Sequence, residues 1–412
     1  MFFRGVALAL FLGAFSADEC VGQGLSHRGH FETAVTAYPQ TAPNDSGRWI
    51  GQSLLRYEPS YKLNSAFRVQ ASFDARTDTH RQTQRSWDLS FWDRTTQWPA
   101  FAVRQLSASY SRGPLSLEFG KQFIRWGKTD ILNPTDRFAP RDYLVVVDNE
   151  FLGVTAARLT LASQSDSLDV VFTPRFTPSR TPLLNQRWVV VPPTAQGLTL
   201  NDAGGLYPGG PQYGSRWNHQ GRAFESSLSF FQGFNHLPLL NTKLIASPLR
   251  LDVTRNYAKI RVWGGDVAAP LPWFTVKAEA AWFQSDTQQA GEYALYVVQL
   301  ERQHGEWLFI GGYAGETVTR QSSVLSFSPD RGLARSLVGR ASYTIDTNRS
   351  VSFEGVARQN GDGFYLKAEY SHAFGQHWRL TGHAVLLRGS ESDFIGQYHR
   401  NSFGVIKLRY SF

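Results

Sequence analysis

Apolar and polar residues alternate with a period of two through most of the chain, from about residue 48 onward. The C-terminal segment shows the pattern well: Ile406, Leu408 and Tyr410 fall on one face, and Lys407 and Arg409 fall on the other. Side chains of a β-strand point alternately to its two faces, so this alternation predicts strands rather than helices. We therefore expect an all-β fold.

The same alternation recurs in segments of strand length that are separated by turn residues. Many approach the roughly 9 to 11 residues with which a tilted strand crosses a bilayer. Lys, Arg and Glu occupy the polar faces in mid-strand, and aromatic residues gather at strand ends, as in transmembrane barrels with a wet interior. These features favour such a barrel over a soluble sandwich or propeller. Clear upstream segments are 67–74, 258–262, 274–282, 337–346 and 364–371.

The spacing of the turns predicts a single antiparallel barrel of about 16 to 18 strands, with 18 preferred. Such barrels alternate short turns at one end with longer loops at the other, and the chain ends share the short-turn side. Short connections fall near 63–64, 112–114, 164–166, 234–240, 268–272, 303–306, 347–349 and 375–377. Longer ones fall near 79–97, 127–152, 177–221, 287–292, 320–332 and 391–398, with brief outer turns near 255–256 and 360–363. We expect the Pro- and Gly-rich loop 177–221 to lie outside as a lid, a partner surface or mobile decoration.

The first 22 residues are typical of a secretion signal. A single Arg precedes an apolar run of about ten residues, which is too short to span a membrane. Small residues follow, and they offer cleavage after Ser16 or after Gly22. The sequence thus predicts a signal peptide over 1–22 and one barrel domain over 23–412.

Composition narrows the function classes. One Cys in 412 residues excludes a disulfide framework and a thiolate metal cage. The net charge of +8 is spread along the chain without a basic block, so we expect no nucleic-acid partner. The chain lacks a Walker loop and the HExxH, CxxC and GxSxG motifs, and its ten His are scattered. We expect neither a cofactor nor enzymatic activity.

Alternation stops after Phe123, where a long segment dense in charge begins. Its Asn-Pro and Ala-Pro steps fix turns, and Phe138 and Tyr143 offer apolar anchors, so a packed loop is predicted. In a wide barrel we expect the loop 125–150 to fold into the interior and narrow it. The charges expected to select solutes are Arg125, Lys128, Asp130, Asp136, Arg137, Arg141, Asp142, Asp148 and Glu150.

The stretch GKQFIRWGKTDILNPTD, which begins at Gly120, resembles a motif of porin-like outer-membrane barrels. These barrels are akin to alginate-export and substrate-specific porins, and some look like partners of lipid or hydrophobe exporters. The resemblance implies that Gln122, Arg125, Trp126, Asn133 and Asp136 form a constriction. The alternative is that they only shape the loop, with Arg125 paired to an acid.

The last residues, KLRYSF, resemble the recognition signal of bacterial outer-membrane barrels. That resemblance implies that Phe412 engages the barrel-assembly machinery.

Strand parity predicts which charges face the barrel interior. Bases exceed acids there, which predicts a mild preference for anions, unless local ion pairs cancel the field. The predicted inward bases are Arg68, Arg175, Lys259, Arg261, Lys277, Arg340, Lys367, Arg379, Lys407 and Arg409. The predicted inward acids are Asp74, Glu118, Asp169, Glu279, Glu301, Asp346 and Glu369.

These patterns together predict a passive channel or export conduit in a bacterial outer membrane. Its solutes would be small, or anionic or hydrophobic, and its partners would be outer-membrane lipid and a periplasmic or inner-membrane transporter. Two alternatives belong to other classes. One is a barrel-embedded lipid hydrolase with His383 as its base, and the other is a secreted soluble β-protein.

Overall fold

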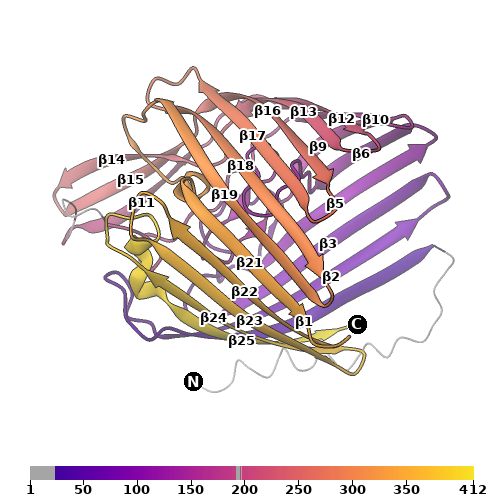
Figure 1. The fold of residues 1–412 in the computed structure, drawn as a ribbon. Coiled ribbons are helices and arrows are strands. Elements are labelled where there is room, and N and C mark those ends of the chain that lie inside the picture. The colour runs from indigo at the N-terminus through magenta and orange to yellow at the C-terminus, as the bar shows by residue number, and fades with distance from the viewer. Residues whose placement is uncertain (1–23, 192–194, 196) are drawn as a thin grey trace.

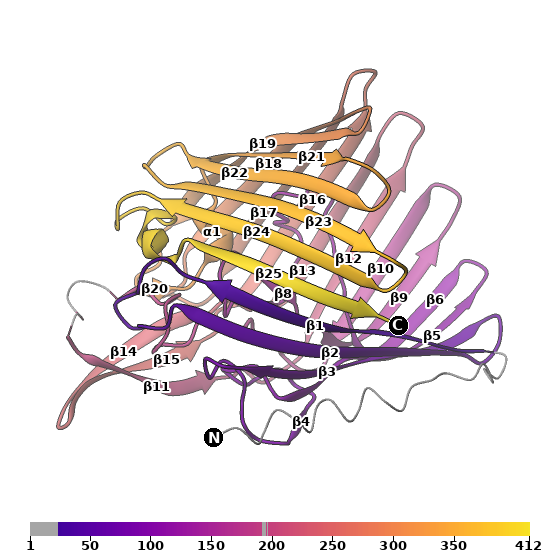
Figure 2. The ribbon, with the colours of Figure 1, turned by 90° about the horizontal axis from the view of Figure 1, so that it is seen from below.

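A computed structural model describes residues 24–191, 195 and 197–412. It is an all-β molecule in which eighteen long strands form one closed barrel (Figures 1 and 2). The barrel strands are β1 (Leu25–Ala37), β2 (Trp49–Lys62), β3 (Phe67–Asp78), β5 (Phe101–Arg112), β6 (Leu115–Gln122), β9 (Val154–Ala162), β10 (Asp166–Thr173), β12 (Gln212–Gln220), β13 (Glu225–Phe234), β16 (Lys259–Pro270), β17 (Thr275–Ser285), β18 (Glu292–His304), β19 (Trp307–Arg320), β21 (Ser336–Thr344), β22 (Arg349–Arg358), β23 (Phe364–Phe374), β24 (Trp378–Arg388) and β25 (Phe403–Ser411).

Smaller elements lie in the connections between these strands. They are β4 (Leu89–Ser90), β7 (Arg141–Asp142), β8 (Glu150–Phe151), β11 (Thr199–Leu206), β14 (Leu239–Ala246), β15 (Leu249–Asn256), β20 (Leu325–Ser326), the helix α1 (Pro329–Gly332) and the 3-10 helix η2 (Gly396–Asn401). In the described part of the chain, no helix has the length and apolar character needed to cross a membrane.

The barrel closes because β1 pairs antiparallel with both β2 and β25. Every other barrel strand pairs antiparallel with its neighbours in the chain, which leaves no free sheet edge in the wall. The predicted all-β barrel and the preferred count of 18 strands are confirmed. The first strand begins at Leu25, well before the clear alternation at residue 48. Residues 1–22, the predicted signal peptide, lie outside the described residues.

The predicted turn pattern is wrong between residues 177 and 256. The strand β12 lies inside the predicted loop 177–221, and the short turn that follows it covers 221–224 rather than 234–240. The predicted turn at 255–256 is instead part of β15, which pairs with β11 on one side and β14 on the other. With β20, which pairs with β14, these strands form a separate four-stranded sheet at the long-loop end. The alternation in β14 and β15 was real, but it belongs to a hairpin beyond the wall.

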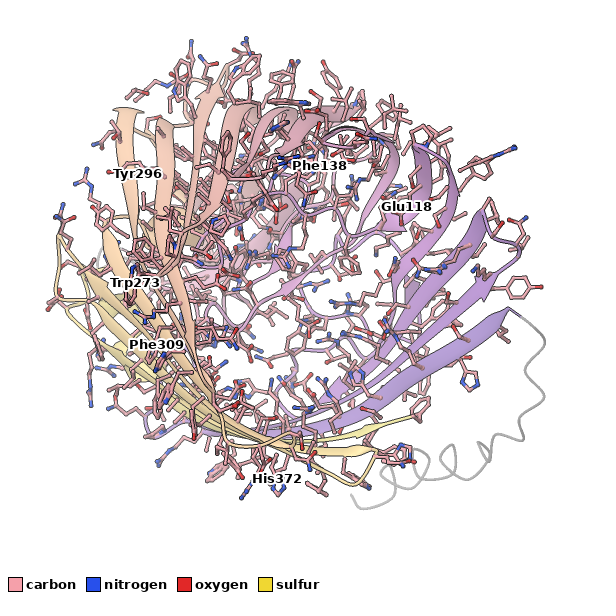
Figure 3. All side chains as sticks on the ribbon, turned by 45° about the vertical axis from the view of Figure 1, so that its right-hand side comes forward. Glu118, Phe138, Trp273, Tyr296, Phe309 and His372 are labelled. Atoms are coloured by element: carbon pink, nitrogen blue, oxygen red, sulfur yellow. The ribbon has the colours of Figure 1, made fainter. Side chains whose placement is uncertain are left out.

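The two faces of the wall differ in a way that positions the site. Trp273, Tyr296, Phe309 and His372 lie on the outside of the barrel, whereas Phe138 lies within it (Figure 3). The inner face over β22–β25 is mixed, with polar residues such as Lys367 and Lys407 beside a buried apolar cluster that includes Val356, Leu387 and Val405. Over β10, β13, β16 and β17 it carries buried apolar side chains that pack with a loop inside the barrel. These inner residues include Val171, Phe231, Ile260, Val262 and Phe283.

Candidate functional site: a loop across the barrel interior

The connection 123–153 between β6 and β9, here called the inward loop, runs across the barrel interior. Its far end is held by Glu279 of β17, whose side chain is almost completely buried. One carboxylate oxygen accepts the backbone N–H of Lys128 at 3.0 Å and the hydroxyl of Thr129 at 3.1 Å. The other accepts the N–H and the hydroxyl of Thr135 at 2.9 and 2.8 Å. A single wall carboxylate therefore fixes two turns of the loop.

Gly127 makes this contact sterically feasible. It has a φ of +94°, a conformation that side-chain-bearing residues rarely adopt. A Cβ atom built at this position would lie 2.6 Å from a carboxylate oxygen of Glu279. The glycine of the WG pair in the motif is thus explained by close approach of the loop to the wall.

Further polar contacts hold the same end of the loop. Asp130 accepts hydrogen bonds from Lys277 of β17 at 3.1 Å and from the Gln299 amide of β18 at 2.6 Å. Lys128 forms an ion pair with Glu225 of β13 at 2.5 Å. The loop therefore contacts the wall from β13 round to β18.

The return arm of the inward loop is held by the opposite wall. Glu150 forms ion pairs with Arg56 of β2 at 3.3 Å, with Arg76 of β3 at 3.0 Å and with Arg104 of β5 at 2.7 Å. Burial alone would raise the pKa of Glu150, but the three guanidinium charges outweigh it and hold the pKa well below its usual value. Asp148 pairs with Lys407 of β25 at 3.5 Å. The loop thus bridges opposite sides of the barrel.

The core of the inward loop is aromatic. Trp126 packs edge-on against Phe138, which packs edge-on against Phe231 of β13, with ring centroids 5.2 and 5.0 Å apart. The guanidinium groups of Arg125 and Arg141 lie over the ring of Phe151, at 4.1 and 4.2 Å from its centroid. Such contacts hold the loop in one conformation inside the barrel.

Asp136 is the acid at the centre of the inward loop. One of its oxygens accepts the backbone N–H of Trp126 at 3.0 Å, and Arg125 lies 3.8 Å from the other. Burial raises the pKa of Asp136 to about 7, although the Trp126 N–H and the nearby Arg137, Arg125 and Arg141 oppose the shift. This carboxyl therefore titrates near neutral pH inside the packed loop.

A second connection also folds inward, contrary to the expectation that 177–221 lies outside. Arg180 forms a buried ion pair with Asp142 of the inward loop, and Trp98 donates to the same carboxylate at 2.7 Å. Trp188 is buried and packs on Tyr398 and Phe403. The segment 177–191 is therefore part of the interior packing and not a surface lid.

The predicted site residues fall into three groups by exposure. Gln122, Trp126, Asn133, Asp136, Arg137 and Asp142 are buried. Asn133 donates to the Thr129 carbonyl and so shapes the loop. Gln122 is the last residue of β6 and donates to the Ala156 carbonyl of β9 at 3.1 Å, so it joins two wall strands instead. Arg125 and Asp130 keep about half of their side-chain surface exposed, at 55% and 51%. Lys128 and Arg141 are intermediate, and Arg141 donates to Asn149 at 2.9 Å.

The predicted inward bases mostly lie on the inner face of the wall. This group comprises Arg68, Lys277, Arg340, Lys367, Lys407 and Arg409. Lys259 and Arg261 do not belong to it: they alternate with the buried Ile260 and Val262, so they point outward, and the prediction is wrong for both. Arg261 pairs with Asp286 at 2.5 Å on this exposed side. The inner face of β16 is apolar because the inward loop covers it.

Sequence reasoning missed the wall residues that hold the loop. Glu279 was expected only to offset the inner bases, and Arg56, Arg76, Arg104 and Gln299 were not singled out at all. No local signal marks them, because their partners lie 46 to 169 residues away in the chain.

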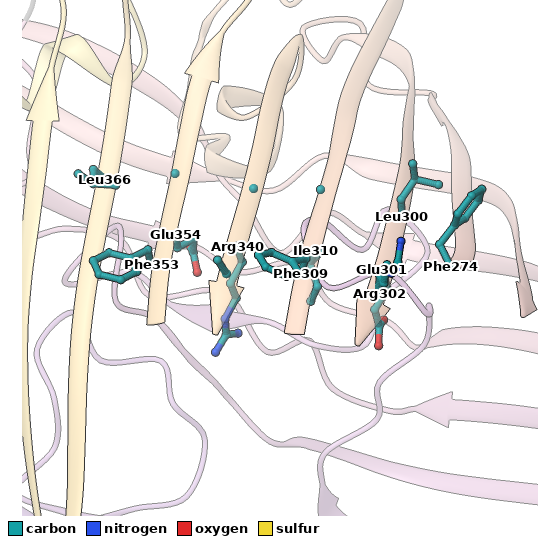
Figure 4. A pocket seen from close by; sticks show the side chains of 14 residues that line it. Phe274, Leu300, Glu301, Arg302, Phe309, Ile310, Arg340, Phe353, Glu354 and Leu366 are labelled. Atoms are coloured by element: carbon teal, nitrogen blue, oxygen red, sulfur yellow. The ribbon is translucent and has the colours of Figure 1, made fainter. Parts of the chain in front are cut away.

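Two other features carry no chemistry for this site. A hollow of about 550 Å³ opens on the outer face of the barrel, over Gly311, Gly339 and Gly355 of three paired strands (Figure 4). It is lined by outward apolar side chains such as Phe309 and Phe353, so it does not belong to the interior. Within the described residues, no group of three or more His, Cys, Asp or Glu side chains is arranged to hold a metal ion.

His383, the base of the hydrolase alternative, lies buried on the inner face of β24. Neither of its ring nitrogens has a hydrogen-bond partner in the described part of the chain. A Ser–His–acid arrangement at this residue is therefore not formed there.

The sequence matches no protein-family profile and no curated protein. The fold, however, is similar to solved structures, one of which is a porin. Pseudomonas aeruginosa OpdQ is 9% identical, with a TM-score of 0.53 over 95% of this chain and 99% of that one. A BenF-like porin from Pseudomonas fluorescens Pf-5 is 9% identical, with a TM-score of 0.55 over 95% and 98%. Acinetobacter baumannii OccAB3 is 10% identical, with a TM-score of 0.56 over 94% and 99%.

Proposed function

We propose that this protein is a channel of a bacterial outer membrane through which small solutes pass passively. The observation that carries the proposal is the inward loop, which is tied to opposite walls of a closed barrel and narrows its interior without joining the wall. Ordered loops at a constriction are how wide barrels restrict passage by size and charge. The likeness of the fold to a BenF-like porin supports the same function.

The outer surface of the wall fits a membrane setting. Large apolar side chains are exposed on most barrel strands, and exposed Trp residues stand near strand ends, among them Trp49, Trp273, Trp307 and Trp378. Exposed apolar surface on this scale is unfavourable in water and favourable against lipid. We therefore propose outer-membrane lipid as the surrounding medium.

The C-terminal residue closes the barrel. The Phe412 backbone exchanges hydrogen bonds with Gly29 of β1 at 2.9 and 3.0 Å. The KLRYSF ending supports engagement of the barrel-assembly machinery. If the channel serves export, its proposed partner is a periplasmic or inner-membrane transporter.

The charges of the interior favour ion pairing over a strong field. With Lys259 and Arg261 outside, the remaining inner bases mostly have acidic partners, such as Asp130 for Lys277 and Glu32 for Arg409. We propose passage of small solutes with a weak preference for anions, set by the exposed Arg125 and the arginines around Glu150.

Single-channel recording tests the proposal. The purified protein should give steady stepwise currents in planar bilayers, with a reversal potential in a salt gradient that slightly favours anions. A folded, heat-modifiable barrel that never conducts would overturn the proposed channel.

Glu150→Gln should make the channel clearly more anion-selective. The substitution removes one of the two carboxylates beside Arg56, Arg76 and Arg104, so Asp74, which pairs with Arg56 and Arg76, is left to offset three guanidinium groups. The reversal potential in a KCl gradient measures the change. Glu32→Gln is the matched control, because Glu32 pairs with Arg409 at 2.6 Å on the wall and has no ion pair with the loop. Equal shifts in the two variants would contradict the role given to Glu150.

A further inference from the structure

A chamber of about 260 Å³ lies between the inward loop and the inner wall formed by β22, β23 and β24. The helix α1 and the connection between β24 and β25 complete its lining. One part of the lining is apolar and includes Val146, Val356, Leu387, Ile395 and Tyr398, which belong to a single buried cluster. The chamber is therefore a built cavity and not a gap beside mobile side chains.

The other part of the lining is polar and incompletely bonded. Asp136, Arg137 and His236 are exposed by only 4%, 8% and 6%, and each lines the chamber. Among the described residues, no hydrogen-bond partner is found for one oxygen of Asp136, for Nε and Nη1 of Arg137, for Nε2 of His236 or for Oδ2 of Asp330. A buried polar atom without a partner costs about 1–3 kcal/mol, so such atoms normally bind water or a ligand.

These groups lie close to one another. Nη1 of Arg137 lies 3.9 Å from Oδ2 of Asp330, and the Arg137 guanidinium lies over the Phe283 ring. Ser179 hydrogen-bonds Nδ1 of His236 at 2.8 Å, and Nε2 of this chamber-lining ring has no partner among the described residues. The polar part thus gathers donors and acceptors from the inward loop, the β13–β14 connection and α1.

The charges around the polar part balance. Arg137 faces Asp330, and the lining adds one more base, Arg141, and two more acids, Glu354 and Asp136. Burial raises the pKa of Asp136 to about 7, so below that pH its carboxyl is mostly neutral and two bases stand against two acids. Burial, followed by the charges of Arg137 and Arg141, lowers the pKa of His236 well below its usual value, so its ring is neutral at pH 7. A ligand with a net charge would leave that charge uncompensated in a buried place, which is costly.

We propose that this chamber is a binding site for an uncharged amphipathic solute. A compact apolar body would pack against Val356 and Leu387. A hydroxyl or amide group would accept from Arg137 and donate to Asp136 or Asp330. This inference rests on the proposed channel, because the chamber would then hold the solute beside the loop that controls passage, and it names the class of solute.

Three probes that share one ring test the inference: benzamide, benzoate and benzylammonium. Binding to the purified full-length barrel in detergent is measured by saturation-transfer NMR and equilibrium dialysis. Benzamide should bind saturably, and the two charged probes should bind at least about tenfold more weakly, because neither charge finds a free counter-ion. Binding of benzoate as tight as that of benzamide would overturn the inference, as would the absence of saturable benzamide binding, which would leave only water in the chamber.

Two variants place the binding in the chamber. Val356→Phe fills the apolar part and should weaken benzamide binding at least about tenfold. Val338→Phe is the matched control, since Val338 pairs directly with Val356 on the inner face but does not line the chamber. Equal effects of the two substitutions would overturn the assignment.

Arg137→Gln gives a second readout that does not depend on filling the cavity. It leaves Asp330 without its base, so the preference should move toward benzylammonium, and an unchanged order of the three probes would overturn the inference. Failure of this inference is distinguishable from failure of the proposed channel. A conducting barrel without saturable benzamide binding overturns the chamber alone, and a non-conducting barrel that binds benzamide overturns the channel alone.

Discussion

Glu279→Ala is expected to free the far end of the inward loop and to raise single-channel conductance severalfold while the barrel stays folded. The substitution removes the acceptor for Lys128, Thr129 and Thr135 and leaves their donor groups without a partner. Hydrogen bonds to a charged group contribute about 1.5–3 kcal/mol each, so the packed loop should lose about 3 kcal/mol or more. The wall keeps its strand pairing, because no ladder hydrogen bond involves this side chain.

The measurement combines conductance with hydrogen exchange of the peptides that cover 123–153. Glu279→Ala should speed exchange in these peptides and leave the β17 and β18 peptides protected. Glu369→Ala is the matched control: it removes an inner carboxylate that pairs with Lys367 at 3.0 Å and has no contact with the loop among the described ion pairs. If the two variants conduct alike, the anchoring role of Glu279 is wrong.

The barrel itself was predictable because strand alternation and turn spacing are local signals. They gave the fold and the strand count even where one hairpin was misplaced. The strand β1 was not predicted because its residues, LSHRGHFETAVTA, place His, Thr and Glu among few apolar side chains. It is recognised as a strand only by its pairing with β2 and β25.

Parity fails where the interior is packed rather than wet. In β16 the apolar residues Ile260 and Val262 face inward, because the inward loop and the wall bury them together. Period two separates two faces of a strand but does not say which face meets lipid when both carry apolar residues. Lys259 and Arg261 were therefore assigned to the wrong side.

The candidate loop was predictable, but its anchors were not. Charge density, prolines and the end of alternation predict a long packed loop over 125–150, within the observed connection 123–153. Its binding to Glu279 and to the arginines around Glu150 joins residues that are distant in the chain, and it follows from barrel closure. The Gly127 requirement likewise becomes visible only when the wall is placed beside it.

The packing of the inward loop should weaken as pH rises from about 4 to 7, and Asp136→Asn should remove this dependence. In the packed loop Asp136 has a pKa of about 7, against 3.8 for the free side chain. The packed state therefore holds the proton more tightly than the released state does. The contribution of the neutral carboxyl is fully present below about pH 4 and is lost as pH approaches 7, amounting to about 4 kcal/mol over that window.

Titration of His236 changes the stability of the packed loop in the opposite direction with pH. The comparison of wild type with Asp136→Asn therefore isolates the contribution of the Asp136 carboxyl. Because burial lowers the pKa of His236 below 6.5, its neutral ring stabilises the packed state above that pH, and this contribution fades as pH falls. Asparagine keeps the acceptor for the Trp126 N–H but does not titrate. Hydrogen exchange of 123–153, corrected for intrinsic rates, should show wild type and Asp136→Asn nearly equally protected at pH 4.5. At pH 8 the wild type should exchange much faster than the variant. Equal protection at both pH values would mean that Asp136 is already charged in the packed loop, and its Arg125 and Arg137 neighbours would then outweigh its burial.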